Sequence, residues 1–85
     1  MNFLDFEVTA GPDNVIEVEL DAQANVMLLD NSDFHSYRTG GSFHYIGGLA
    51  TKSPFVIRPP RQGQWHVVVD RGGYGGTLRA SCAVL

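Results

Sequence analysis

The chain has 85 residues, 44% of them hydrophobic, and a net charge of −3, a composition typical of one small globular domain. Its single cysteine, Cys82, excludes an intramolecular disulfide and a four-cysteine zinc cluster, so we expect a reducing compartment. Nucleic acids and anionic membranes demand a basic surface, and the acidic balance argues against both as partners.

The charges are divided along the chain. Eight of the nine acidic residues lie at or before Asp33, and all six basic residues lie at or after Arg38. The two halves either attract each other within the domain or produce a dipolar surface that favours head-to-tail or self-complementary association. The acidic start, MNFLDFEVT, is unlike a signal peptide, and no apolar window approaches the ~18 residues of a membrane helix, so we expect a cytoplasmic protein.

Hydrophobic alternation with a period of two predicts strands along the chain. Apolar and acidic residues alternate over 4–8 and again over 15–21, so one face of each predicted strand lies against a core. The run NVMLL within 24–30 is apolar on both faces, as in a central strand that is covered on both sides. Four further strands are predicted over 42–46, 54–58, 64–70 and 77–85.

The segment DNSDFHSYRTGG, residues 30–41, is the longest one without a strand pattern. It opens with residues that can cap a helical turn, and Phe34 and Tyr37 can anchor that turn on the core. Turn-forming clusters elsewhere, including IGG at 46–48, have the spacing of an all-β sandwich or barrel. We predict one all-β domain over residues 1–85, a compact, jelly-roll-like antiparallel β-sandwich or partly closed barrel of six to eight strands, with one helical turn near 31–38.

The stretch GQWHVVVDRGGYGG, residues 63–76, is interpreted as a strand running into a turn. Trp65 is expected to be a core anchor whose indole N–H reaches a carbonyl near the sheet edge. His66 and Asp70 share a face but lie about 13 Å apart, too far for a catalytic pair. The glycines of 72–76 lack the lysine and hydroxyl of a phosphate-binding loop, and they predict a hairpin turn with a bulge.

Strands that alternate up and down bring the loops 11–14, 30–41 and 59–63 to one end of the domain. This end collects the candidate ligand- or partner-binding residues, which are Asp33, His35, Tyr37, Arg38 and Arg61. Arg38 can clamp a carboxylate or phosphate, and the alternative is a salt bridge to the acidic first half. The acidic residues there match no calcium-binding loop motif, so we predict no metal and no cofactor.

The sequence contains no pattern of nucleophilic catalysis. Its three histidines lie on separate predicted elements without metal-ligand spacing, and we expect them to be half-exposed. Cys82 alternates toward the core of the last strand, where a thiol is usually inert packing. We therefore predict that the protein is not an enzyme.

Three segments carry a resemblance to a known family: QANVMLLDNSDFHSYRTGG, YIGGLATKSP and PPRQGQWHVVVDRGGYGGTLRAS. In order and spacing they resemble the small bacterial family catalogued as domain of unknown function 1883. Its members occur alone or joined to Toll/interleukin-receptor-type signalling domains, which implies a recognition or sensing module and supplies no catalytic residues. More distantly, residues 54–85 are similar to the last strands of pre-peptidase C-terminal jelly-roll domains, which bears on architecture alone.

Two functions follow as expectations. The first is a non-enzymatic module that recognises a protein partner or a second copy of itself, through an edge strand or the 30–41 loop. The alternative is a small-ligand sensor at the same loop end, with Arg38 as polar anchor and Tyr37 as lid.

Overall fold

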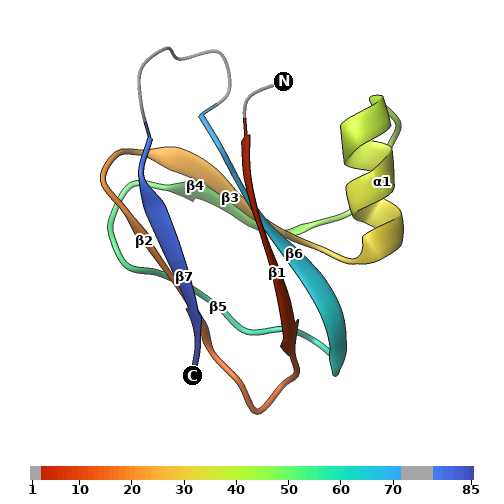
Figure 1. Ribbon diagram of the computed structural model, residues 1–85, viewed down its shortest axis with the longest axis horizontal. Coiled ribbons are helices and arrows are strands. Elements are labelled where there is room, and N and C mark those ends of the chain that lie inside the picture. Colours follow the sequence, from red (N-terminus) through yellow and green to blue (C-terminus); the bar gives the residue numbers. More distant parts are fainter. Residues whose placement is uncertain (1–2, 72–77) are drawn as a thin grey trace.

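The computed structural model describes residues 3–71 and 78–85, which form two antiparallel β-sheets and one helix (Figure 1). One sheet has the strand order β1-β6-β3-β4, and the other has the order β5-β2-β7. The elements are β1 Phe3–Ala10, β2 Ile16–Leu20, β3 Ala24–Leu29, α1 Asn31–Thr39, β4 Ile46–Ala50, β5 Phe55–Ile57, β6 Gly63–Asp70 and β7 Ala80–Val84. The described strands form two separate sheets, so the fold is the predicted sandwich and not a closed barrel.

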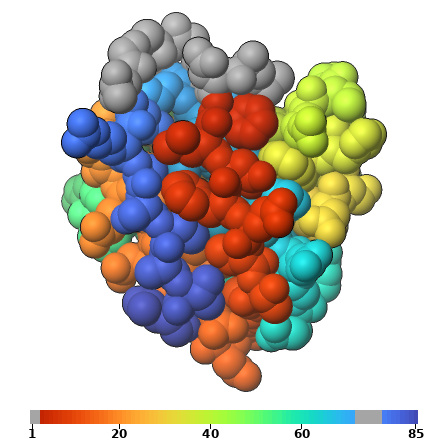
Figure 2. Space-filling view, viewed as in Figure 1, coloured from red at the N-terminus to blue at the C-terminus, as the bar shows by residue number. Residues whose placement is uncertain are grey.

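The main core lies between the two sheets. Alternation along β6 directs Trp65, Val67 and Val69 into this core, where they meet the buried side chains Ile16 and Val18 of β2. Complete burial of each such aliphatic side chain stabilises the fold by about 1.5–3 kcal/mol. The edge strands β1 and β7, which belong to different sheets, run side by side (Figure 2).

A second, smaller core lies between the four-stranded sheet and α1. Met27 and Leu29 of β3 and Val68 of β6 turn away from the main core and pack beneath Tyr37. The central strand β3 is therefore covered on both faces, as the run NVMLL predicted. Phe34 packs against the same cluster, which confirms the predicted anchoring of this segment.

The helix α1 spans nine residues, more than the single turn predicted, and is capped at both ends. At its start, the Asp30 side chain accepts a hydrogen bond from the Asp33 backbone N–H at 2.7 Å. At its end, Gly40 adopts the left-handed conformation, and the Gly41 N–H donates to the Ser36 carbonyl. These caps satisfy backbone groups that a nine-residue helix would otherwise leave unpaired.

The predicted strand over 42–46 is wrong, because the strand is β4, Ile46–Ala50, and it contains the glycines that were interpreted as a turn. Gly47 has a φ of 131°, and a Cβ there would lie 2.1 Å from the carbonyl oxygen of Val26. Glycine allows β4 to approach β3 this closely. In the sequence alone, two adjacent glycines with this role look the same as the glycines of a turn. The hairpin and bulge predicted for the glycines of 72–76 lie outside the described residues.

Within the part of the chain that the structure describes, α1 is the only helix, and it is too short to cross a membrane.

Candidate functional site

The predicted loop end brings two of the five candidate residues together. The carboxylate of Asp30 accepts the backbone N–H of Asp33 on one oxygen and the Arg61 guanidinium on the other, at 3.0 Å. Arg61 also lies over the Trp65 ring, with its guanidinium carbon 4.6 Å from the ring centroid. Both candidates thus bind Asp30, and the ion pair between Asp30 and Arg61 holds the start of α1 against the loop before β6.

The other three candidates lie further along α1 and do not join that pair. Tyr37 is 6% exposed, and its hydroxyl donates to the carboxylate of Asp70, so its ring faces the core and is not presented to solvent as a lid. His35 and Arg38 are exposed. The Arg38 guanidinium lies 5.6 Å from the centre of the Phe34 ring, a cation–π contact in place of the salt bridge considered from the sequence.

The hydrogen bonds to the Asp30 carboxylate stabilise its ionised form in the folded state. The backbone N–H of Asp33, helped by Arg61, lowers its pKa below the ordinary value. A carboxyl group with a lowered folded-state pKa contributes stability above its unfolded pKa, and this contribution is lost as the pH falls through the folded pKa.

We expect Asp30→Ala to lower the free energy of unfolding by about 1 kcal/mol at pH 7, the usual cost of losing an N-cap. The difference from the wild type should shrink as the pH falls below the ordinary carboxyl pKa and through the lowered folded-state pKa of Asp30, where the wild-type carboxyl becomes protonated. Urea unfolding at a series of pH values measures both. Asp30→Asn is the matched control because asparagine also caps helices, and a control as unstable as the alanine variant would contradict the capping role.

Sequence reasoning missed a polar cluster that lies beneath the start of α1. His66 is 7% exposed and not half-exposed as expected, and its Nδ1 donates to Asp5 of β1 at 2.9 Å. Its Nε2 lies 2.9 Å from Oδ1 of Asn31, and Phe34 stacks flat on the ring at a centroid distance of 3.9 Å. His66 and Asp70 bind different partners, in agreement with the prediction that they are not a pair.

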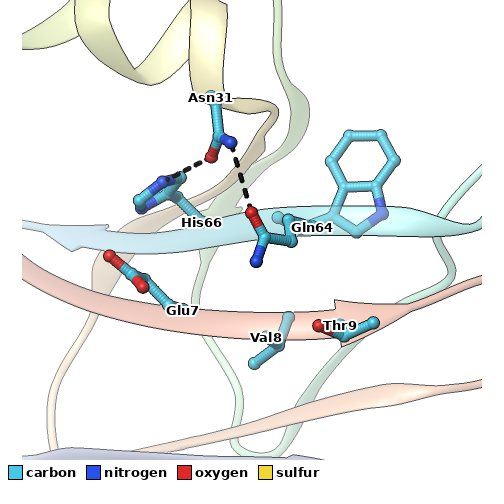
Figure 3. Close-up of a pocket in the computed structure, with 7 residues that line it drawn as sticks. Glu7, Val8, Thr9, Asn31, Gln64 and His66 are labelled. Carbon is cyan, nitrogen blue, oxygen red and sulfur yellow. Dashed lines mark hydrogen bonds between the residues drawn. The ribbon is translucent and has the colours of Figure 1, made fainter.

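A hollow of about 300 Å³ opens beside this cluster (Figure 3). Glu7, Asn31, Gln64 and His66 supply most of its polar lining, with Asn31 hydrogen-bonded to both Gln64 and His66. The hollow lies at the base of α1, so it adjoins the 30–41 segment without using the five candidate residues. It can accept a small ligand that carries several hydrogen-bonding groups.

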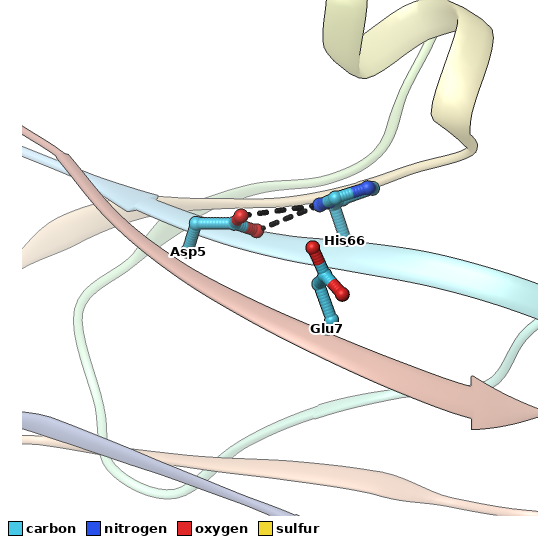
Figure 4. A group of neighbouring side chains, drawn as sticks. All are labelled: Asp5, Glu7 and His66. Atoms are coloured by element: carbon cyan, nitrogen blue, oxygen red, sulfur yellow. Dashed lines mark hydrogen bonds and ion pairs between the residues drawn. The ribbon is translucent and has the colours of Figure 1, made fainter.

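Asp5, Glu7 and His66 also form a possible ligand set for a metal ion (Figure 4). One ligand atom from each side chain lies within 4.8 Å of the others, and carboxylate with imidazole suits several divalent ions. The His66 Nδ1 proton already bridges to Asp5, so a metal would have to replace that hydrogen bond. The set differs from the acidic loop residues considered for calcium in the sequence.

A different kind of surface lies at the edge of the four-stranded sheet. β4 pairs with β3 on one side only, and it ends the sheet. Tyr45, Ile46 and Leu49 are 51%, 40% and 55% exposed there. An uncharged edge strand with exposed large hydrophobic side chains is a template for pairing with another strand.

The chain belongs to the family described as domain of unknown function (DUF1883), whose model matches residues 1–85. This confirms the resemblance inferred from the three segments. No curated protein and no solved structure matches the chain, and the similarity to pre-peptidase C-terminal domains stays a prediction.

Proposed function

We propose that this DUF1883 chain is a non-enzymatic recognition module that binds a protein strand along the free edge of β4. The observation that carries the proposal is the combination of an unpaired edge, no charged residue across Ile46–Ala50, and three exposed hydrophobic side chains. Main-chain hydrogen bonds along such an edge supply affinity, and the exposed side chains supply specificity.

The other described sheet edges are less suited to pairing. β1 carries Asp5 and Glu7, charges of the kind that natural proteins place on edges to prevent association. β5 has only three residues, and the side chains at the start of β7 are small. β7 is as long as β4 and also uncharged, but it lies against β1 and exposes large apolar side chains only at its end, at Val84 and the following Leu85. Of the four edges, β4 is the uncharged strand whose free side carries exposed large apolar side chains along its length.

An aromatic row supports the exposed edge from within. The Tyr45 ring lies 5.9 Å from Phe43, and Phe43 lies 5.3 Å from the buried Tyr37 in an edge-to-face contact. A side chain that is already held in place loses less conformational entropy when a partner binds. This row connects the 30–41 segment to the β4 edge, so the segment considered from the sequence adjoins the edge proposed here.

The surroundings of the His66 imidazole and the Cys82 thiol support a binding role over catalysis. Phe34 covers one face of the His66 ring, and the two ring nitrogens bind Asp5 and Asn31. Both nitrogens that could exchange a proton with a substrate therefore already have a partner. Burial raises the pKa of the Cys82 thiol, which disfavours the nucleophilic thiolate. A single cysteine also suits a reducing compartment, and we place the module in the cytoplasm.

The alternative function is small-ligand sensing, and the polar hollow beside Asn31 and His66 favours it. A ligand that binds only the folded state raises the melting temperature, and the stabilisation grows with the logarithm of its concentration relative to its Kd. A thermal-shift screen of metabolites and divalent ions therefore tests this alternative, with Glu7→Gln as the variant that alters the hollow.

We expect Leu49→Lys to abolish capture of a specific partner, because it places a charge on the apolar edge of β4. The free energy of unfolding should change by less than about 0.5 kcal/mol, as at other exposed positions. The measurement is affinity capture from lysate of the cells that encode the chain, followed by mass spectrometry.

Val56→Lys is the matched control for this experiment, since Val56 is also 55% exposed but lies on β5. A partner retained by the control and lost by Leu49→Lys supports recognition at β4. Equal capture by the two variants would overturn the assignment of the surface.

A further inference from the structure

We propose that the occupant of the β4 edge is a second copy of this chain, paired antiparallel through β4 about a twofold axis at Gly47. The inference rests on the proposed function, because it names the strand that the β4 edge receives. In the resulting dimer, the two four-stranded sheets join into one continuous eight-stranded sheet.

The register of β4 against β3 determines which side chains a second β4 strand would meet. Ile46 lies opposite Leu28 on the core side, together with Gly48, whereas Leu49 lies opposite Asn25 on the α1 side. Residues that lie directly opposite in an antiparallel pair share a face of the sheet. A twofold pair must therefore be centred on a residue and not between two residues.

Centring on Gly47 makes the edge complementary to itself. Ile46 then lies over Gly48 of the second copy, and Tyr45 lies against Leu49 of the second copy. A Cβ at Gly48 would meet no atom within 4 Å, so there is open space for the isoleucine. Centring on Gly48 instead would place Ile46 opposite Ala50, which is already buried.

Charges at the ends of the ladder agree with this pairing. Lys52 follows β4 and is exposed, whereas at the opposite end the carboxylate of Asp33 accepts the backbone N–H of His44. Antiparallel pairing brings the lysine end of one copy toward the aspartate end of the other. Opposite charges thus approach each other at both ends, and the two lysines stay apart.

The arrangement is tested by disulfide trapping in a Cys82→Ala background. Opposite positions of an antiparallel pair have Cα atoms about 4.5–5.5 Å apart, within the range of a disulfide. We expect the double variant Tyr45→Cys, Leu49→Cys to form a covalent dimer under mild oxidation. Each single variant should not, because the two copies of one position lie about 13 Å apart along the ladder. Mixing the two single variants should restore the cross-link.

Sedimentation measurements on the wild type and on Leu49→Lys accompany the trapping. We expect a concentration-dependent dimer that Leu49→Lys weakens at least about tenfold, and that Val56→Lys leaves unchanged. A wild type that stays monomeric at several hundred micromolar overturns self-pairing, but β4-dependent capture of another protein would still support the recognition function. A dimer that is not trapped through positions 45 and 49 overturns the Gly47-centred register.

Discussion

Replacing Trp65 with alanine is expected to lower the free energy of unfolding by about 4 kcal/mol. The ring is buried between the sheets, and its Nε1–H donates to the carbonyl of Ala10 at 3.2 Å and to that of Arg61 at 3.3 Å. Alanine would leave a large cavity, expose both carbonyls to an apolar void and remove the ring beneath the Arg61 guanidinium. Urea unfolding followed by far-ultraviolet circular dichroism measures the loss.

Trp65→Phe is the control that separates packing from hydrogen bonding. Phenylalanine keeps most of the apolar surface but has no N–H for the Ala10 and Arg61 carbonyls, so we expect a loss of about 1–2 kcal/mol. A loss below about 1.5 kcal/mol for the alanine variant would contradict the role of Trp65 as the main anchor of the core.

The placement of Trp65 shows how much of this fold follows from local pattern. Alternation identified the face of β6 that carries Trp65, Val67 and Val69, and the need to satisfy an indole N–H predicted a carbonyl partner at the sheet edge. The cap at Asp30 was predictable for the same reason, because its partner lies only three residues away. Interactions between near neighbours in sequence require no knowledge of how strands pair.

The β4 strand shows where local pattern misleads. Gly47 and Gly48 resemble a turn, and their actual role depends on the proximity of Val26, more than twenty residues earlier in the chain. Nothing in the segment itself reveals that a carbonyl of β3 occupies the space where a Cβ would lie. Because the strand boundary was predicted wrongly, the exposed apolar edge of β4 could not be identified from the sequence.

The polar cluster around His66 was missed for a related reason. Alternation placed His66 on the face of β6 away from Trp65. It did not predict which strand would lie beside His66. Pairing of β1 with β6 places Glu7 opposite His66 and brings Asp5 within hydrogen-bond distance, although 61 residues separate Asp5 from His66 in the chain. An aspartate and a glutamate on one face of the strand predicted over 4–8 were the available signal, and finding their partner required the register of that strand against its neighbour.

His66→Ala is expected to lower the free energy of unfolding by about 3 kcal/mol, because it removes a buried ring and leaves its hydrogen-bond partners, Asp5 and Asn31, without the imidazole. Phe34 would lose the ring on which it stacks, and Asn31 would lose its hydrogen bond at the first turn of α1. We therefore expect α1 to become the least protected element, which amide hydrogen exchange measures residue by residue.

A double-mutant cycle between His66→Ala and Asp5→Ala then isolates the interaction between the two side chains. We expect a coupling free energy of about 1–2 kcal/mol, within the range for side chains in direct contact. Glu7→Ala is the matched control, since Glu7 lies directly opposite His66 in the ladder whereas the Nδ1 hydrogen bond goes to Asp5, and the coupling of Glu7 to His66 should be below about 0.5 kcal/mol. Equal coupling of His66 to both carboxylates would instead indicate that the three side chains act as one unit, as expected of a site that binds a cation.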